Sequence, residues 1–250
     1  MLILGINAYE HTSSAAFLLD GRVVFATAEE RFTRIKRHKC FPSRSIQEGF
    51  DFLKIDIEDI DAIAIGWNPA VEAFKVNGAL GNRPRELLYF KIVEAFMSMS
   101  SLRDEDSDWT MMRTSGNAIP DIYFVRHHLS HASNAAFQSP FESGDVLTLD
   151  FMGERQTGCF GNFEDSSLKI HTYSKQPSST GAFYAAITEL IGYKYDSDEW
   201  KVMALSGLPC NERKVSKYIE VFKESILDRG IAPFLKNQFY CCDQPREKYL

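Results

Sequence analysis

Three short apolar segments fill the first thirty residues, and this pattern constrains the fold of the chain most strongly. The segments are residues 2–8, 15–19 and 23–28, and Asp20-Gly21 between the last two is a hairpin signal. They predict a three-strand antiparallel meander. A second set predicts another meander after residue 145, with strands at residues 146–150, 157–162 and 168–173.

Helices and further strands are expected to follow each meander. Apolar residues at helical spacing predict helices from Ser43 or Ser45 to about Leu53, from Ser178 or Ser179 to Ile191, and over 212–228. Strands are expected at 61–67 and 121–125, an irregular helical region at 70–112 with its clearest part at 86–99, and a surface loop at 103–117. The alternation predicts an α/β protein with two related subdomains, 1–144 and a partial 145–250. This is the architecture of the actin-like ATPase and sugar-kinase (ASKHA) superfamily.

Composition excludes several classes of protein. Hydrophobic residues make up 44% and charged residues 25% of the 250 residues, as in an ordinary globular protein. The formal charge of -6 argues against broad nucleic-acid binding. Five cysteines without a CxxC spacing indicate reduced thiols and no zinc site. With no signal peptide and no apolar run of about 18 residues, a cytoplasmic protein without membrane association is expected.

The segment around His127 and His131 is a candidate metal site. Histidines four residues apart project from the same face of a helix and can bind one ion. The apolar strand that ends at Asp150 can bring a carboxylate to the same place, and two histidines with a carboxylate suit iron or another first-row metal. The alternative is that the histidines only cap and pack the helix. His128 is expected to face away from the metal and to orient a ligand.

The turns after the first strand of each meander are candidate phosphate-binding segments. Ser13 and Ser14 lie in the first turn, and Gly153 and Glu154 lie in the second, within residues 151–156. Backbone amides and hydroxyls in such turns can bind phosphate, and glycine permits close approach of the backbone. Glu154 can hold a magnesium ion or a ribose, or have no ligand.

Five segments, taken together and in order, resemble the NodU/CmcH family of O-carbamoyltransferases. They are residues 4–16, 28–36 followed by Phe41-Pro42, 127–132, 148–154, and the weaker 201–205. The resemblance implies transfer of a carbamoyl group to a hydroxyl of a small-molecule acceptor, through a carbamoyl-adenylate made from ATP and carbamoyl phosphate. In the family a TsaD-like domain performs the transfer and a YrdC-like domain makes the adenylate. The chain corresponds to the first part of the TsaD-like domain, so a separate chain or a longer protein is expected to supply the rest.

The same resemblance assigns roles to individual residues. His127, His131 and Asp150 fall on the iron ligands of the family, whose further carboxylate ligand lies outside this sequence. His11 falls beside the reacting carbamoyl group, where an imidazole can act as general base. Lys36, with Arg31 and Arg34, can neutralise phosphate or the charge of the leaving group. The alternatives are an ordinary loop histidine and a solvated basic turn.

The chain also departs from the family pattern. Thr12 stands where the family commonly has Asp, Phe151 and Trp200 stand where it has glycine, and Ala204 replaces another glycine. These differences weaken the expectation of ATP binding more than the expectation of metal binding. A second hypothesis is therefore a truncated, catalytically impaired metal- or nucleotide-binding module that acts through a partner chain. A third, a relative of tRNA threonylcarbamoyl transferases, is less favoured because residues 29–32 and the negative net charge fit it poorly.

Overall fold

The computed structural model describes residues 1–8, 12–67, 109–112, 120–154, 156–175, 178–210, 212–229 and 232–235. Two compact units divide the chain, Met1–Ser130 and His131–Leu250, and the division falls inside one helix, α5. The division does not test the subdomain boundary expected at residue 145, which stays a prediction.

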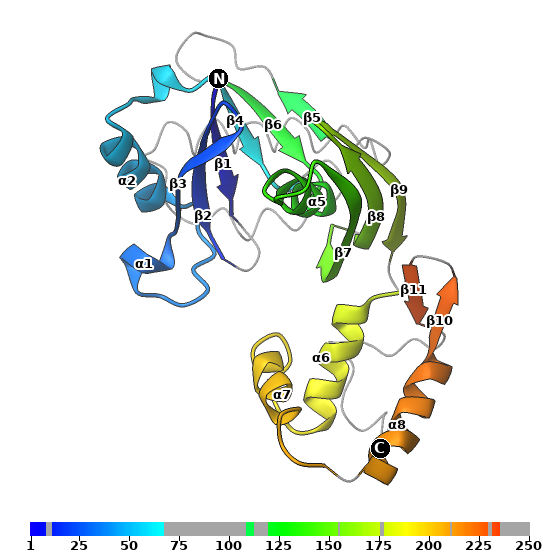
Figure 1. The fold of residues 1–250 in the computed structure, drawn as a ribbon. Helices are drawn as coiled ribbons and strands as arrows, with labels where there is room; N and C mark the ends of the chain where they lie inside the picture. The colour runs from blue at the N-terminus through cyan, green and yellow to red at the C-terminus, as the bar shows by residue number, and fades with distance from the viewer. Residues whose placement is uncertain are drawn as a thin grey trace. The chain divides into compact units, whose positions relative to one another are not determined.

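The first unit is built on a mixed sheet (Figure 1). Among its described residues six strands pair in the order β3-β2-β1-β4-β6-β5. Strands β1, β2 and β3 form the predicted antiparallel meander, while β4 and β6 run parallel to β1. The strands are β1 (Leu2–Asn7), β2 (Ser14–Leu19), β3 (Arg22–Ala28), β4 (Ala62–Ile65), β5 (Trp109–Met112) and β6 (Asp121–Val125).

Alternating apolar side chains form the core of this unit. Buried residues recur at every second position in β1, β4 and β6, for example Leu4 and Ile6. Helix α2 (Ser43–Leu53) contacts β2 and β3, as Figure 1 shows. A Cβ at Gly49 would lie 2.7 Å from Cζ of Phe17, so the absence of a side chain at Gly49 lets α2 pack directly on the Phe17 ring.

The second unit begins with another antiparallel meander, of β7 (Ser143–Gly153), β8 (Gln156–Glu164) and β9 (Ser167–Lys175). Helix α6 (Thr180–Leu190) contacts β7. Helices α7 (Glu199–Leu205) and α8 (Glu212–Ser225) follow, and β10 (Ile226–Arg229) pairs with β11 (Ala232–Leu235). The α/β class and the repeated three-strand meander, on which the expectation of an ASKHA-type fold is based, are therefore confirmed.

Two elements differ from the prediction. Residues 109–112, expected in a surface loop, form β5, which pairs antiparallel with β6 at the edge of the first sheet. The final helix ends at Ser225 and not at residue 228, because residues 226–229 pair with β11 instead. Both differences arise from pairing with another strand, which the apolar periodicity of a single segment cannot predict. Of the helical region expected at 70–112, residues 70–108 lie outside the described residues, and residues 109–112 form β5 and not a helix.

Two short elements complete the first unit. They are α1 (Glu30–Thr33) and the 3-10 turn η1 (Ile57–Asp59), which Asp56 caps. No helix among the described residues is long and apolar enough to span a membrane.

Candidate metal centre and neighbouring turns

Helix α5 (His127–Phe137) carries both histidines of the candidate metal site. His128, Ala132 and Ala136, spaced by four residues, are buried at 2% exposure or less and form its packed face. His127 and His131 lie one position earlier on the helix, on the adjacent and more exposed face. The buried alanines therefore pack this face of α5 against the rest of the protein, and the adjacent face carries the two imidazoles. His128 lies outside the cluster, as predicted.

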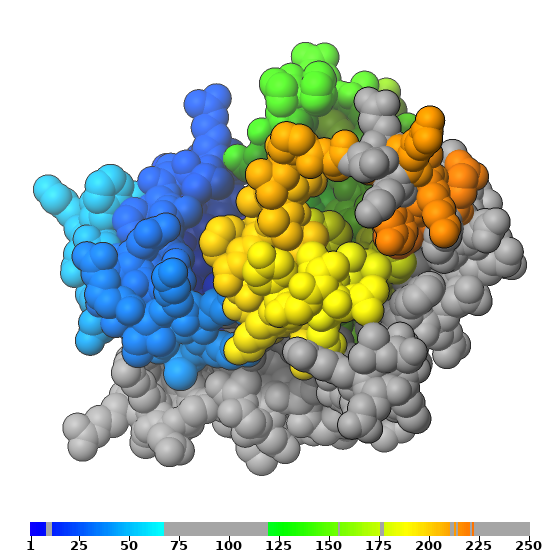
Figure 2. Space-filling view, turned by 90° about the horizontal axis from the view of Figure 1, so that it is seen from below, coloured from blue at the N-terminus to red at the C-terminus, as the bar shows by residue number. Residues whose placement is uncertain are grey.

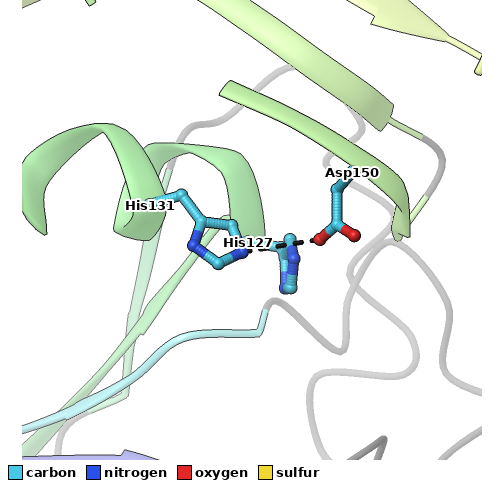
Figure 3. Close-up of side chains that lie close together, drawn as sticks. All are labelled: His127, His131 and Asp150. Carbon is cyan, nitrogen blue, oxygen red and sulfur yellow. Dashed lines mark ion pairs between the residues drawn. The ribbon is translucent and has the colours of Figure 1, made fainter. Parts of the chain in front are cut away.

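Asp150 brings a carboxylate to these imidazoles (Figure 3). The ligand atoms of His127, His131 and Asp150 all lie within 4.8 Å of one another. Oδ2 of Asp150 is 3.5 Å from Nε2 of His131, and the two side chains are 37% and 53% exposed. The grouping predicted from the HxxxH spacing and the strand end is thus present in the structure.

The donor set fits a first-row divalent metal. Bonds of about 2.1 Å place neighbouring donors of a tetrahedral site about 3.4 Å apart, close to the His131–Asp150 separation. Two imidazoles and one carboxylate leave further positions for other ligands, as in non-haem iron sites. His127, His131 and Asp150 therefore form a set of donors that could hold one metal ion.

Aromatic rings pack around His127. The Trp67 and His127 rings have centroids 6.0 Å apart at an interplanar angle of 78°, and His128 is edge-to-face with His127 at 5.3 Å. Trp67 follows β4 and is itself buried. Edge-to-face packing of this kind restricts the rotation of an aromatic side chain. The His127 imidazole is thus held from two sides.

The first candidate phosphate turn is only partly described, because His11 lies outside the described residues. Ser13 is buried, and its hydroxyl donates to the carbonyl oxygen of His38 at 2.7 Å. Ser14 begins β2 and pairs with Asn7 and Ala28. The structure thus shows Ser13 joining the turn to the segment that contains Lys36, and the phosphate-binding role of both serines stays a prediction.

The predicted basic residues lie in and after α1. Arg31, Arg34 and Lys36 are all exposed, and Arg34 has a left-handed backbone with φ of 58°. Glu29, a fully buried carboxylate just before α1, accepts hydrogen bonds from the first turn of α2 and so joins the start of α1 to that helix. The basic side chains therefore project from a well-anchored segment, and their roles stay predictions.

The second candidate turn is shorter than predicted. Strand β7 continues through Gly153 and β8 begins at Gln156, so residues 151–153 are extended and not part of a polar turn. A shift in pairing register between Leu149 and Gly153 allows this continuation. Glu154 is buried with φ of 57°, and both amide atoms of Gln156 are buried without a hydrogen-bond partner among the described residues. The described residues of the turn therefore include buried polar groups, and the binding role of Gly153 and Glu154 stays a prediction.

The fold and the site together define an α/β protein with a His-His-Asp candidate metal centre. The sequence profile described as "Carbamoyltransferase N-terminus" matches residues 2–228, and the chain belongs to this family. An uncharacterized Synechocystis protein, sll1178, is 32% identical over 243 residues, covering 90% of this chain and 37% of that protein. The nodulation protein NolNO of Sinorhizobium fredii is 31% identical over 227 residues, covering 90% and 31%.

This chain thus spans about a third of the length of these two relatives. Among solved structures, YeaZ from Pseudomonas aeruginosa aligns with a TM-score of 0.38 and 13% identity, over 72% of this chain and 68% of that one.

Sequence reasoning missed the residues that support the site. Trp67, Glu29 and Ser179 all act through contacts with distant segments, and none carries a local motif for that role. A helix-capping signal was present at Ser179, since serine before an apolar helix is a common N-cap. Nothing in that signal indicated its second contact, with the strand that carries Asp150.

Proposed function

We propose that the chain is part of an O-carbamoyltransferase that moves a carbamoyl group from carbamoyl-adenylate to a hydroxyl of a small-molecule acceptor. Membership of the carbamoyltransferase family supports the class of reaction. The convergence of His127, His131 and Asp150 is the observation that carries the proposal of a metal-dependent site. Carbamoyl phosphate and ATP are the proposed sources of the adenylate.

The proposed roles follow from the chemistry of each residue type. The metal, Fe(II) or another divalent ion held by His127, His131 and Asp150, would supply Lewis acidity toward bound oxygen atoms. His11 would take the proton of the acceptor hydroxyl, the usual work of an imidazole near neutral pH. Lys36, exposed on an anchored segment, would offset the negative charge of the leaving group.

Nucleotide binding is proposed at the two turns. Ser13, Ser14 and Arg31 are the candidates on the first unit, and Gly153 and Glu154 on the second. The buried amide of Gln156, without a partner among the described residues, supports a polar ligand or water at the second turn.

The test has two parts. The chain is purified without oxygen, and its iron content and Fe(II) affinity are compared with those of His131→Ala. Carbamoyl transfer from labelled carbamoyl phosphate is then followed with ATP and a panel of hydroxylated acceptors, with and without a YrdC-like domain added. We expect near-stoichiometric iron that His131→Ala loses, and transfer that His11→Ala abolishes. Equal iron content in the wild-type chain and His131→Ala would contradict the proposed metal site. Unchanged turnover in His11→Ala would contradict the proposed role of His11 as general base.

A second candidate function is a metal- or nucleotide-binding module that acts through a partner chain. Large apolar side chains on and after α7 favour it, since Trp200, Met203 and Leu208 are each at least 60% exposed. Figure 2 shows this part of the surface in yellow to light orange. Exposed apolar groups of this kind are common at interaction sites. Strong binding of a hydrophobic dye that Trp200→Lys with Met203→Lys abolishes would support this candidate, and wild-type dye binding in the variant would count against it.

A further inference from the structure

Ser179 joins the start of α6 to the strand that carries Asp150. Its Oγ donates to the carbonyl oxygen of Phe151 at 2.7 Å and lies 3.2 Å from the carbonyl oxygen of Asp150. The same oxygen accepts a hydrogen bond from the Ala182 N–H at 3.0 Å, so Ser179 is also the N-cap of α6. A hydroxyl has one proton to donate, so the two carbonyl oxygens share it in a three-centre bond whose shorter arm goes to Phe151, while a lone pair of Oγ accepts from Ala182.

Gly181 brings the helix against the same backbone. A Cβ at this position would lie 2.6 Å from the carbonyl carbon of Asp150, and it would also contact the Phe151 amide nitrogen. Any side chain here would therefore push the helix away from the strand. The close approach places the hydroxyl of Ser179, a residue that is only 2% exposed, within reach of both carbonyl oxygens.

The peptide group between Asp150 and Phe151 controls the direction of the Asp150 carboxylate. The Phe151 N–H donates to Oδ1 of Asp150 at 2.6 Å, and Oδ2 then lies 3.5 Å from Nε2 of His131. This N–H belongs to the same peptide plane as the Asp150 carbonyl that Ser179 contacts. Rotation of the plane would therefore move the carbonyl, the N–H and the carboxylate together.

We propose that Ser179 is a positioning residue for the metal-ligating carboxylate of Asp150. Its hydroxyl holds the carbonyl groups on both sides of Phe151 and so restrains the Asp150–Phe151 peptide plane, and the Phe151 N–H then holds Oδ1 so that Oδ2 points at His131. The inference rests on the metal site of the proposed function. Hydrogen-bonded neighbours orient metal ligands in this way, and their removal commonly costs about 10- to 100-fold in metal affinity.

Three variants of Ser179 separate positioning from helix capping. Ser179→Ala removes both functions, and Ser179→Thr keeps the hydroxyl. Ser179→Asp keeps an acceptor for the Ala182 N–H but has no proton to donate to the two carbonyl oxygens. Ser45→Ala is the matched control, because Ser45 is also a buried serine whose hydroxyl donates a hydrogen bond in the first turn of a helix, in this case to Glu29.

The experiment titrates Co(II) into the purified chain, follows the visible absorption, and measures hydrogen exchange of the Phe151 amide in metal-free protein. We expect Ser179→Ala and Ser179→Asp to lower Co(II) affinity about tenfold, change the absorption band and speed Phe151 exchange. Ser179→Thr should restore all three, and Ser45→Ala should change none. Wild-type affinity, spectrum and exchange in Ser179→Asp would overturn the proposal and leave helix capping as the role of Ser179.

The experiment also distinguishes an error in the proposed metal site from an error in the proposed role of Ser179. If neither the wild-type chain nor His131→Ala binds Co(II), the proposed function loses its metal centre. Phe151 exchange in the metal-free variants still tests the positioning of the peptide plane. Faster exchange in Ser179→Ala and Ser179→Asp, with recovery in Ser179→Thr, would support the positioning role, and equal exchange in all four proteins would overturn it.

Discussion

Glu29 and Ser45 join two segments that are sixteen residues apart. The backbone N–H and the hydroxyl of Ser45 both donate to Oε2 of Glu29, at 2.7 and 2.8 Å. Oε1 of Glu29 accepts from the Arg44 N–H at 3.2 Å, so a fully buried carboxylate satisfies two amides of the first turn of α2. Helix α2 has no side-chain cap at Pro42, and negative charge at this end is favoured by the helix dipole. Glu29 therefore takes the place of a local cap.

Glu29→Gln should destabilise the protein. The amide group of glutamine has one acceptor oxygen and brings an NH₂ group toward backbone donors, so at least one buried N–H loses its partner. Because hydrogen bonds to charged groups contribute about 1.5–3 kcal/mol each, we expect the free energy of unfolding to fall by about 2–3 kcal/mol in urea denaturation. Glu30→Gln is the control, since Glu30 accepts an exposed bond from the Arg37 N–H. An equal loss in both variants would contradict the capping role.

Gly49→Ala should also destabilise the first unit. Alanine in a helix gains about 0.5–1 kcal/mol over glycine, but an added methyl group in this core costs about 1–3 kcal/mol because it meets the Phe17 ring. We expect a net loss of about 1 kcal/mol in the free energy of unfolding. Adding Phe17→Leu makes room for the methyl group, so the double variant should lose less than the sum of the single variants. If the losses in the free energy of unfolding of the two single variants simply add, the methyl group at residue 49 does not clash with the Phe17 ring.

Lys201 should control the ionisation of Asp198. Its Nζ lies 2.9 Å from Oδ1 of Asp198, and this hydrogen bond is the main reason that the pKa of Asp198 falls below its ordinary value of 3.8. The stabilisation is present above pH 3.8 and is lost as the pH falls through the lowered pKa of the folded protein. Lys201→Met should therefore raise the pKa of Asp198 in an NMR titration. Lys169→Met is the control, and an unchanged pKa in Lys201→Met would refute the assignment.

Asp150→Asn should weaken metal binding while leaving the fold intact. The amide oxygen can still accept from the Phe151 N–H, but it carries no charge for the ion. Since even outer partners of metal ligands contribute about tenfold, we expect Co(II) affinity to fall by more than about tenfold. Asp145→Asn, on the same strand, is the control because Asp145 is exposed and outside the cluster. Full affinity in Asp150→Asn would remove Asp150 from the ligand set.

The meanders and the grouping of His127, His131 and Asp150 were predictable because their signals are local. Alternating apolar residues define β1 to β3, and an HxxxH spacing fixes the histidines on one face of α5. Asp150 could be placed with them because it ends an apolar run in the second meander. The residues that hold the cluster were not predictable in the same way. Ser179 lies 29 residues from Asp150, and the contact depends on how α6 approaches β7.

Strand pairing explains the two errors of secondary structure. Residues 109–112 lie in a polar stretch, and β5 becomes recognisable only through its hydrogen bonds with β6. Residues 226–228 continue the helical periodicity of α8, but they pair with β11 across a two-residue separation in the sequence. In both cases hydrogen bonding to a partner strand determines the secondary structure, and the intrinsic propensity of the segment does not.

The placement of both imidazoles on one turn of α5 has a consequence for redesign of the centre. The helix geometry sets the distance between the two imidazoles. Substitutions elsewhere should therefore leave this distance unchanged, as long as the buried residues His128, Ala132 and Ala136 keep α5 in place. The carboxylate comes from a separate strand whose backbone is set by α6. Substitutions intended to change the metal preference of the proposed site should therefore spare α5 and target the residues that orient Asp150.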